Sequence, residues 1–85
     1  MNIEFSNLFN NQRETAPLEI KIAFREALEL FLENSEHIAL RNHSLTKEYA
    51  GLRSIDVTSD WRAIYRKEQD KIIFMQIGTH EKLYG

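Results

Sequence analysis

The chain has 85 residues, a formal net charge of −2 at pH 7 and no cysteine. This length suits one domain with a small core, and the lack of cysteine excludes a disulfide framework and a zinc–cysteine site. No apolar run is long enough to cross a bilayer, and the first residues do not form a signal peptide. We therefore expect a cytoplasmic protein, a single domain over residues 1–85, without a metal or other cofactor and without a membrane partner.

The charges are distributed unevenly along the chain. Residues 1–36 contain seven glutamates and three basic residues, whereas residues 37–85 contain eight Lys or Arg and six acids. Contacts with RNA phosphates need basic side chains, so the C-terminal part is the better candidate for a nucleic-acid surface. An ordinary solvated surface of mixed charge explains the same asymmetry equally well.

The N-terminal part predicts a strand followed by two helices. Residues 3–5 alternate in polarity, as in a short strand, and Ser6 resembles the N-cap of a short helix. Pro17 suits the first turn of a second helix, because its missing N–H would have no partner there. The second helix should end near Asn34 and bury a stripe of residues at helical spacing, namely Ile20, Phe24, Ala27, Leu28 and Phe31.

The C-terminal part predicts three strands. Residues 36–50 resemble an irregular connection, after which the apolar period changes from 3.6 to 2. Strands are predicted at residues 54–58, 61–67 and 71–77, and the short breaks between them favour an antiparallel meander. The expected fold class is α+β, with two N-terminal helices packed on one face of a twisted antiparallel sheet.

Alternation along the three strands assigns side chains to the two faces of the sheet. The set assigned to the helix-covered face is apolar and comprises Ile55, Val57, Trp61, Ala63, Tyr65, Ile73, Met75 and Ile77. The set assigned to the open face comprises Asp56, Arg62, Arg66, Gln76 and, if the last strand continues, His80. One packed and one wet face is normal for an antiparallel sheet, so this pattern alone requires no function.

The polar and aromatic residues nevertheless match the needs of RNA cleavage without a metal. The 2′-hydroxyl must lose a proton as it attacks the adjacent phosphate, the leaving 5′-oxygen must gain one, and the phosphoryl charge needs a fixed cation. Histidine suits proton transfer near neutral pH, arginine pairs with phosphate oxygens, and aromatic rings hold an unstacked base. Suitable groups are His43, His80, Arg62, Trp61 and Tyr84. Each could equally be a surface histidine, an exposed strand arginine or a core aromatic residue.

Several short strings, in order along the chain, resemble the consecutive motifs of the YafQ-type and RelE-type bacterial toxins. They are residues 42–45 (NHSL), 51–57 (GLRSIDV), 60–66 (DWRAIYR), 77–80 (IGTH) and 83–85 (LYG). The resemblance extends over nearly the whole chain. It implies the RelE-like toxin fold and a toxin of a type II toxin–antitoxin system that cleaves mRNA on the ribosome. It also implies a cognate antitoxin that binds the toxin in a hetero-oligomer.

The resemblance implies roles for individual residues. His43 matches the histidine of the family's H-x-L segment, and Asp60 and Trp61 match its D-W pair. His80 matches the Gly-Thr-His histidine, the best candidate for proton transfer, and Tyr84 matches the aromatic position that follows it.

Further roles come from the strand residues. Arg62 matches the strand arginine that contacts the scissile phosphate in RelE-type relatives. YafQ-type members often have a second histidine where this chain has Asp56, so the set of proton-transfer groups differs here. The expected catalytic residues are His80, His43, Asp60 and Arg62. The expected substrate-binding residues are Trp61, Tyr84, Arg66 and Asp56.

A second hypothesis is a binding toxin on the same scaffold that does not cleave RNA. It would be a gyrase inhibitor like those of the ParE branch, or a nuclease whose catalysis has decayed. Asp56 and the acidic balance favour this alternative, whereas His80 and Arg62 favour the nuclease. In either case the acidic helical part is a candidate surface for the antitoxin.

Overall fold

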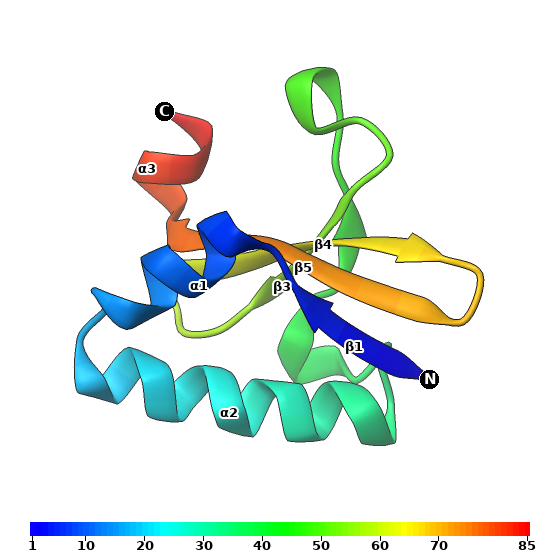
Figure 1. The fold of residues 1–85 in the computed structure, drawn as a ribbon, viewed down its shortest axis with the longest axis horizontal. Coiled ribbons are helices and arrows are strands. Elements are labelled where there is room, and N and C mark those ends of the chain that lie inside the picture. Colours follow the sequence, from blue (N-terminus) through cyan, green and yellow to red (C-terminus); the bar gives the residue numbers. More distant parts are fainter.

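The computed structural model describes residues 1–85 and is built around a five-stranded sheet with the strand order β1-β5-β4-β3-β2 (Figure 1). The strands are β1 (Asn2–Phe5), β2 (His43–Ser44), β3 (Arg53–Asp56), β4 (Trp61–Glu68) and β5 (Lys71–Thr79). β1 runs parallel to β5, and the other neighbouring strands are antiparallel. The helices are α1 (Asn7–Glu14), α2 (Leu18–Glu33) and α3 (His80–Tyr84), with 3-10 turns η1 (Ile38–Leu40) and η2 (Lys47–Tyr49). The predicted α+β class is confirmed.

The first helix completes the edge of the sheet where β1 ends. Ser6 caps α1 by accepting a hydrogen bond from the Phe9 N–H, as its sequence position predicts. The same hydroxyl donates to the Met75 carbonyl at 2.7 Å. Further along α1, the side-chain oxygen of Gln12 accepts from the Ile77 N–H at 2.8 Å. α1 thus satisfies backbone groups of β5 that β1 is too short to reach.

The second helix covers one face of the sheet, below it in Figure 1. Its predicted stripe is buried at Ile20, Phe24, Ala27 and Phe31, while Leu28 is partly buried against the same core. Phe74 of β5 lies at the centre of this core. Five aromatic rings have centroids 5.3–5.9 Å from its own, those of Phe5, Phe9, Phe24, Phe31 and Tyr65. Buried aromatic area and favourable ring geometry together make this cluster the main stabilising contact between helix and sheet.

The structure corrects the prediction of which β5 residues face the helices. Ile72, Phe74 and Ile77 are buried in the core, whereas Ile73 and Met75, which the alternation assigned to it, are only partly buried. The cause is a bulge: Ile64 pairs with Gln76 but its neighbour Tyr65 pairs with Phe74. The extra residue reverses the alternation on either side of it.

The ends of the predicted elements differ in three further places. β5 continues to Thr79 and then stops, so His80 is not a strand residue but the first residue of α3. The supposedly irregular connection contains η1, β2 and η2. β3 ends at Asp56, two residues before the predicted end. No helix combines the length and the hydrophobicity needed to span a membrane.

Candidate active site

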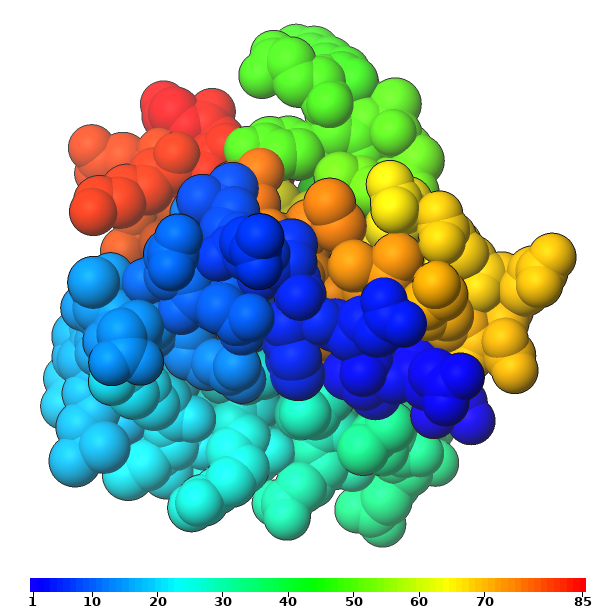
Figure 2. Space-filling view, in the orientation of Figure 1, coloured from blue at the N-terminus to red at the C-terminus, as the bar shows by residue number.

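The face of the sheet opposite α2 is bounded by two projections. The loop around η2 and the short helix α3 rise from it on the side away from α2 (Figure 1). Figure 2 shows the same two projections in space-filling form, η2 in green and α3 in red, above the orange residues of β5. The floor between them is the face that the sequence predicts to be open, but its central residues Ser54 and Ile64 are fully buried.

Strand register places the residues of this floor in rows, because directly paired residues point to the same face. One row crosses from β2 to β5 and contains His43, Ser54, Ile64 and Gln76. The next row contains Asp56, Arg62 and Gly78. The predicted placement of Asp56, Arg62 and Gln76 on the open face is therefore confirmed.

Arg62 is fixed at the turn between β3 and β4. Its Nε lies 3.0 Å from Oδ1 of Asp56. Its Nη1 donates to the carbonyl oxygens of Thr58, Ser59 and Trp61 at 3.0, 3.2 and 3.1 Å. Its side chain is only 13% exposed, and none of these hydrogen bonds uses Nη2. The guanidinium is thus held in one orientation, and its Nη2 makes no hydrogen bond within the protein.

Asp56 lies between two arginines. Its second carboxylate oxygen, Oδ2, is 3.8 Å from Nε of Arg41, whose side chain is 74% exposed. The contact with Arg62 is therefore the shorter and the more buried of the two. Asp56 orients Arg62 and offsets part of its charge.

His43 has one ring nitrogen free. Its Nδ1 lies 2.8 Å from the carbonyl oxygen of Arg41, and a carbonyl can only accept, so Nδ1 donates. In the neutral ring this leaves the lone pair on Nε2. His43 is exposed, and that nitrogen can accept a proton from a group on the open face.

His80 is presented by the start of α3. Its N–H donates to the carbonyl oxygen of Asp60 at 2.8 Å, and Thr79 caps the helix by accepting from the Lys82 N–H. The exposed imidazole packs against Tyr84, with ring centroids 4.8 Å apart at an angle of 64°. Neither ring nitrogen has a hydrogen-bond partner within the protein, so both remain available to a ligand.

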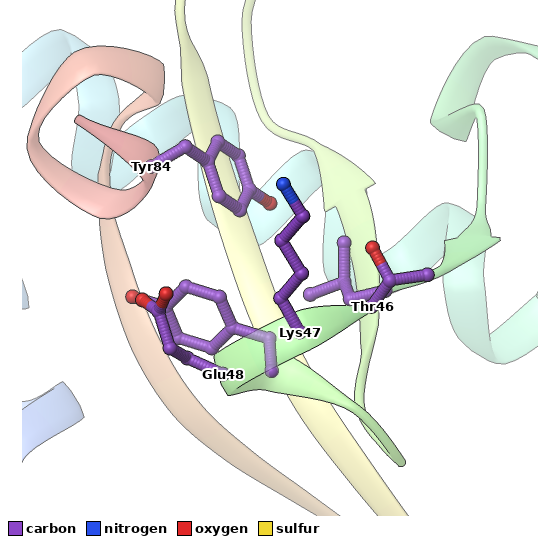
Figure 3. A pocket seen from close by; sticks show the side chains of 6 residues that line it. Thr46, Lys47, Glu48 and Tyr84 are labelled. Carbon is purple, nitrogen blue, oxygen red and sulfur yellow. The ribbon is translucent and has the colours of Figure 1, made fainter.

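A hollow of about 240 Å³ separates η2 from α3. It is lined by Leu45, Thr46, Lys47, Glu48, Tyr49 and Tyr84. The hydroxyl of Tyr84 is buried without a hydrogen-bond partner. Figure 3 shows this hydroxyl and the ammonium of Lys47 directed into the same space. The sequence offered no sign of Lys47, Glu48 or Tyr49 as site residues, since a short irregular segment has no period to interpret.

The remaining expected site residues have other surroundings. Trp61 faces the helix-covered side and packs against the core, so its ring is not on the open face. Asp60 is exposed in the turn before β4. Arg66 forms an ion pair with Glu68 at 3.1 Å and lies four residues from Arg62, roughly 13 Å along the strand. No cluster of His, Cys, Asp or Glu in residues 1–85 has the arrangement of a metal site.

Comparison with protein families gives one match that spans residues 1–85, to the bacterial toxin of type II toxin–antitoxin systems, YafQ. The chain belongs to the YafQ toxin family. The resemblance found in the sequence motifs is thereby confirmed. No curated protein matches this sequence significantly.

Solved structures agree with the fold of this YafQ-family toxin. YafQ from E. coli strain BL21(DE3) is 24% identical over 99% of this chain and 98% of that chain, with a TM-score of 0.83. A chain of the E. coli DinJ–YafQ toxin–antitoxin complex has the same identity over 99% and 97%, with a TM-score of 0.80. The toxin–antitoxin complex RelBE2 of Mycobacterium tuberculosis contains a chain 17% identical over 93% and 90%, with a TM-score of 0.75.

Proposed function

We propose that this YafQ-family toxin is a ribosome-dependent endoribonuclease that cleaves mRNA without a metal cofactor. The observation that carries the proposal is the presence, on one side of the sheet, of two histidines with free ring nitrogens and one immobilised guanidinium. His43, Arg62 and His80 come from three separate segments that only the fold brings to this face. Family membership supports the proposal, since YafQ toxins are ribonucleases.

In the proposed reaction, Nε2 of His43 removes the proton of the 2′-hydroxyl as that oxygen attacks the adjacent phosphorus. Protonated His80 gives its proton to the departing 5′-oxygen. Nη2 of Arg62 binds a non-bridging oxygen and stabilises the extra negative charge of the transition state. The products are one strand with a 2′,3′-cyclic phosphate and one with a free 5′-hydroxyl, so atoms and charge balance without water.

The other expected site residues have supporting roles in this proposal. Asp56 orients Arg62, and Arg66 binds a phosphate farther along the mRNA. Tyr84 holds the His80 ring and packs against a base. Trp61 supports the segment before His80, because it pairs with Thr79 across the strands. We assign the base to His43 rather than to Asp60, whose backbone carbonyl instead binds the His80 N–H.

We propose the ribosome and a cognate antitoxin as partners, with a toxin–antitoxin hetero-oligomer as the resting state. The solved toxin–antitoxin complexes DinJ–YafQ and RelBE2 support the antitoxin as a partner. Dependence on the ribosome is proposed from the resemblance of the sequence motifs to those of YafQ-type and RelE-type toxins.

The chemistry of the product ends tests this function. Defined mRNA on purified ribosomes is incubated with the protein, and the fragments are probed for the terminal groups. The proposal expects a 5′-hydroxyl, which polynucleotide kinase labels directly, and a 2′,3′-cyclic phosphate on the other fragment. A 5′-phosphate, which blocks labelling until it is removed, would contradict attack by the 2′-hydroxyl.

The pairing of Asp56 with Arg62 favours a second candidate function, a binding toxin that does not cleave RNA. In that case an acid offsets the one immobilised cation of the floor, and the protein acts by occupying a target such as gyrase. DNA-damage markers after induction, together with intact mRNA and continuing translation, would support this candidate against the nuclease.

A further inference from the structure

We propose that Tyr49 is a positioning residue that holds His80 in place through α3 and Tyr84. It lies outside the set of residues that the sequence motifs point to, and it does not itself touch the reacting groups. The structural part of the proposal concerns the orientation of His80. Its catalytic consequence rests on the nuclease function proposed above.

One hydrogen bond joins the η2 loop to α3. The hydroxyl of Tyr49 donates to the carbonyl oxygen of Leu83 at 2.7 Å, across 34 positions of sequence. No other hydrogen bond connects residues 45–52 with residues 80–85. The bond ends on one of the last carbonyls of α3, which have no partner within a helix.

α3 depends on such contacts, because it has only five residues and so short a helix is not stable alone. Its first residue is fixed by the Asp60 carbonyl and the Thr79 cap. Its last turn is held by Leu83, which is 7% exposed and packs over Gly78. The Gly85 N–H closes this end internally by donating to the Glu81 carbonyl, and Tyr49 supplies the only hydrogen bond that reaches it from another segment.

Aromatic contacts through Tyr84 connect Tyr49 to His80. Its ring meets that of Tyr84 edge to face, with centroids 5.7 Å apart at 89°. Tyr84 in turn packs on His80 at 4.8 Å. The three rings therefore form a continuous series from the η2 loop to the imidazole. A shift of Tyr84 changes both the location of His80 and the surface against which it packs.

The η2 loop is shaped to hold Tyr49 without help from a ligand. The Leu45 N–H donates to the Leu52 carbonyl at 2.9 Å and closes the loop at its base. Lys47 and Gly51 have φ values of 57° and 90°, in the left-handed region that costs a non-glycine residue about 1 kcal/mol. A loop closed in this way holds the Tyr49 hydroxyl against the last turn of α3.

The test compares Tyr49→Phe, which keeps the ring contact with Tyr84 and loses only the hydroxyl, with Tyr49→Ala, which loses both. Tyr65→Phe is the matched control, because its hydroxyl accepts a 2.7 Å hydrogen bond from Asn42 on the other face of the sheet. Single-turnover cleavage of ribosome-bound mRNA gives the rate and the half-saturating toxin concentration. NMR signals of the His80 ring report its orientation, with His43 as the internal reference.

We expect Tyr49→Phe to slow cleavage about threefold to tenfold and Tyr49→Ala more, with half-saturation changed by less than about twofold. The His80 ring signals should shift in both variants, more than those of His43. Tyr65→Phe should change neither the rate nor the His80 signals, although it also removes a tyrosine hydroxyl that takes part in a 2.7 Å hydrogen bond.

Unchanged His80 signals in both Tyr49 variants would overturn the proposal, whatever the cleavage rate. If the wild-type protein cleaves no mRNA, the nuclease function fails, and the NMR comparison still decides whether Tyr49 positions His80. Shifted His80 signals with an unchanged cleavage rate would overturn the catalytic consequence.

Discussion

Among single residues, His43 and Arg62 owe their orientation to backbone carbonyl groups. The Arg41 carbonyl fixes which nitrogen of His43 has a proton, and three carbonyls of the β3–β4 turn hold Nη1 of Arg62. These contacts are made before any substrate binds. Groups oriented in advance lose little free energy in reaching the transition state, which is the main way in which a small site can accelerate a reaction.

Removal of the proposed base gives the first prediction. His43→Ala should lower single-turnover cleavage by about 10²–10⁴-fold, the usual contribution of a positioned base. His37→Asn is the control, because His37 only caps η1 through the Ala39 N–H and asparagine is also a good cap. Equal rates for the two variants would remove His43 from the mechanism.

The Asp56–Arg62 pair gives the second prediction. Asp56→Asn keeps an oxygen that can accept from Nε of Arg62 but removes the negative charge. Binding to ribosomes that contain mRNA should strengthen at low salt. The slope of log affinity against log salt concentration should become more negative by about one, as expected for one additional phosphate contact. Asp70→Asn, the same change in the exposed β4–β5 turn, should have a smaller effect. Identical salt dependence for both variants would show that Arg62 does not contact phosphate.

Among the elements, those with a sustained pattern were predictable from the sequence and the short or interrupted ones were not. The stripe of α2 extends over about three turns, and the capping position of Ser6 has a definite side-chain requirement. α3 has five residues and β2 has two, too few to establish a period. The bulge at Met75 is set by pairing with β4, so a strand considered alone gives no sign of it.

The site, too, was predictable from the sequence only in part. The residue types needed for the chemistry could be recognised in the sequence, and so could the open face that displays Asp56 and Arg62. The hydrogen-bond partners could not, because carbonyl groups and their directions have no sequence signature. The link between Tyr49 and His80 depends on contact between the η2 loop and α3, which are distant in sequence.

Two neighbouring isoleucines test the bulge. Ile72→Ala should lower the free energy of unfolding by about 2–5 kcal/mol, since Ile72 is 2% exposed within the aromatic core. Ile73→Ala makes the same chemical change on the open face and should cost clearly less. Urea unfolding of the two variants measures both values. A larger decrease in the free energy of unfolding for Ile73→Ala than for Ile72→Ala would mean that Ile73 faces the core, as uninterrupted alternation predicts, and would contradict the observed register.

For the whole molecule, the two sides of the sheet have different surfaces. The side of α2 that faces solvent combines the exposed apolar residues Leu18, Ile22 and Leu32 with Glu26, Glu29 and Glu33. The opposite side has the histidines and arginines of the proposed site. A partner that binds α2 is therefore expected to be basic and partly apolar, and to differ from the phosphate-rich partner of the open face.

Charge reversal on α2 gives the fourth prediction. Glu29→Lys should weaken binding of the cognate antitoxin several-fold, mainly through slower association, because an exposed charge steers the encounter. Asp70→Lys changes the charge by the same amount far from α2 and should leave the affinity nearly unchanged. Surface plasmon resonance at two salt concentrations measures both rates. Equal affinities for the two variants would remove α2 from the antitoxin interface.

The most direct test of the central claim is cell-free translation with purified wild-type protein beside His80→Ala, followed by primer extension on the mRNA. We expect discrete cuts that require ribosomes, appear with the wild type and disappear with the variant. His80 is exposed at the start of α3, so the substitution should leave the fold intact. Unimpaired translation and intact mRNA with the wild type, or the same cuts with the variant, would contradict the assignment.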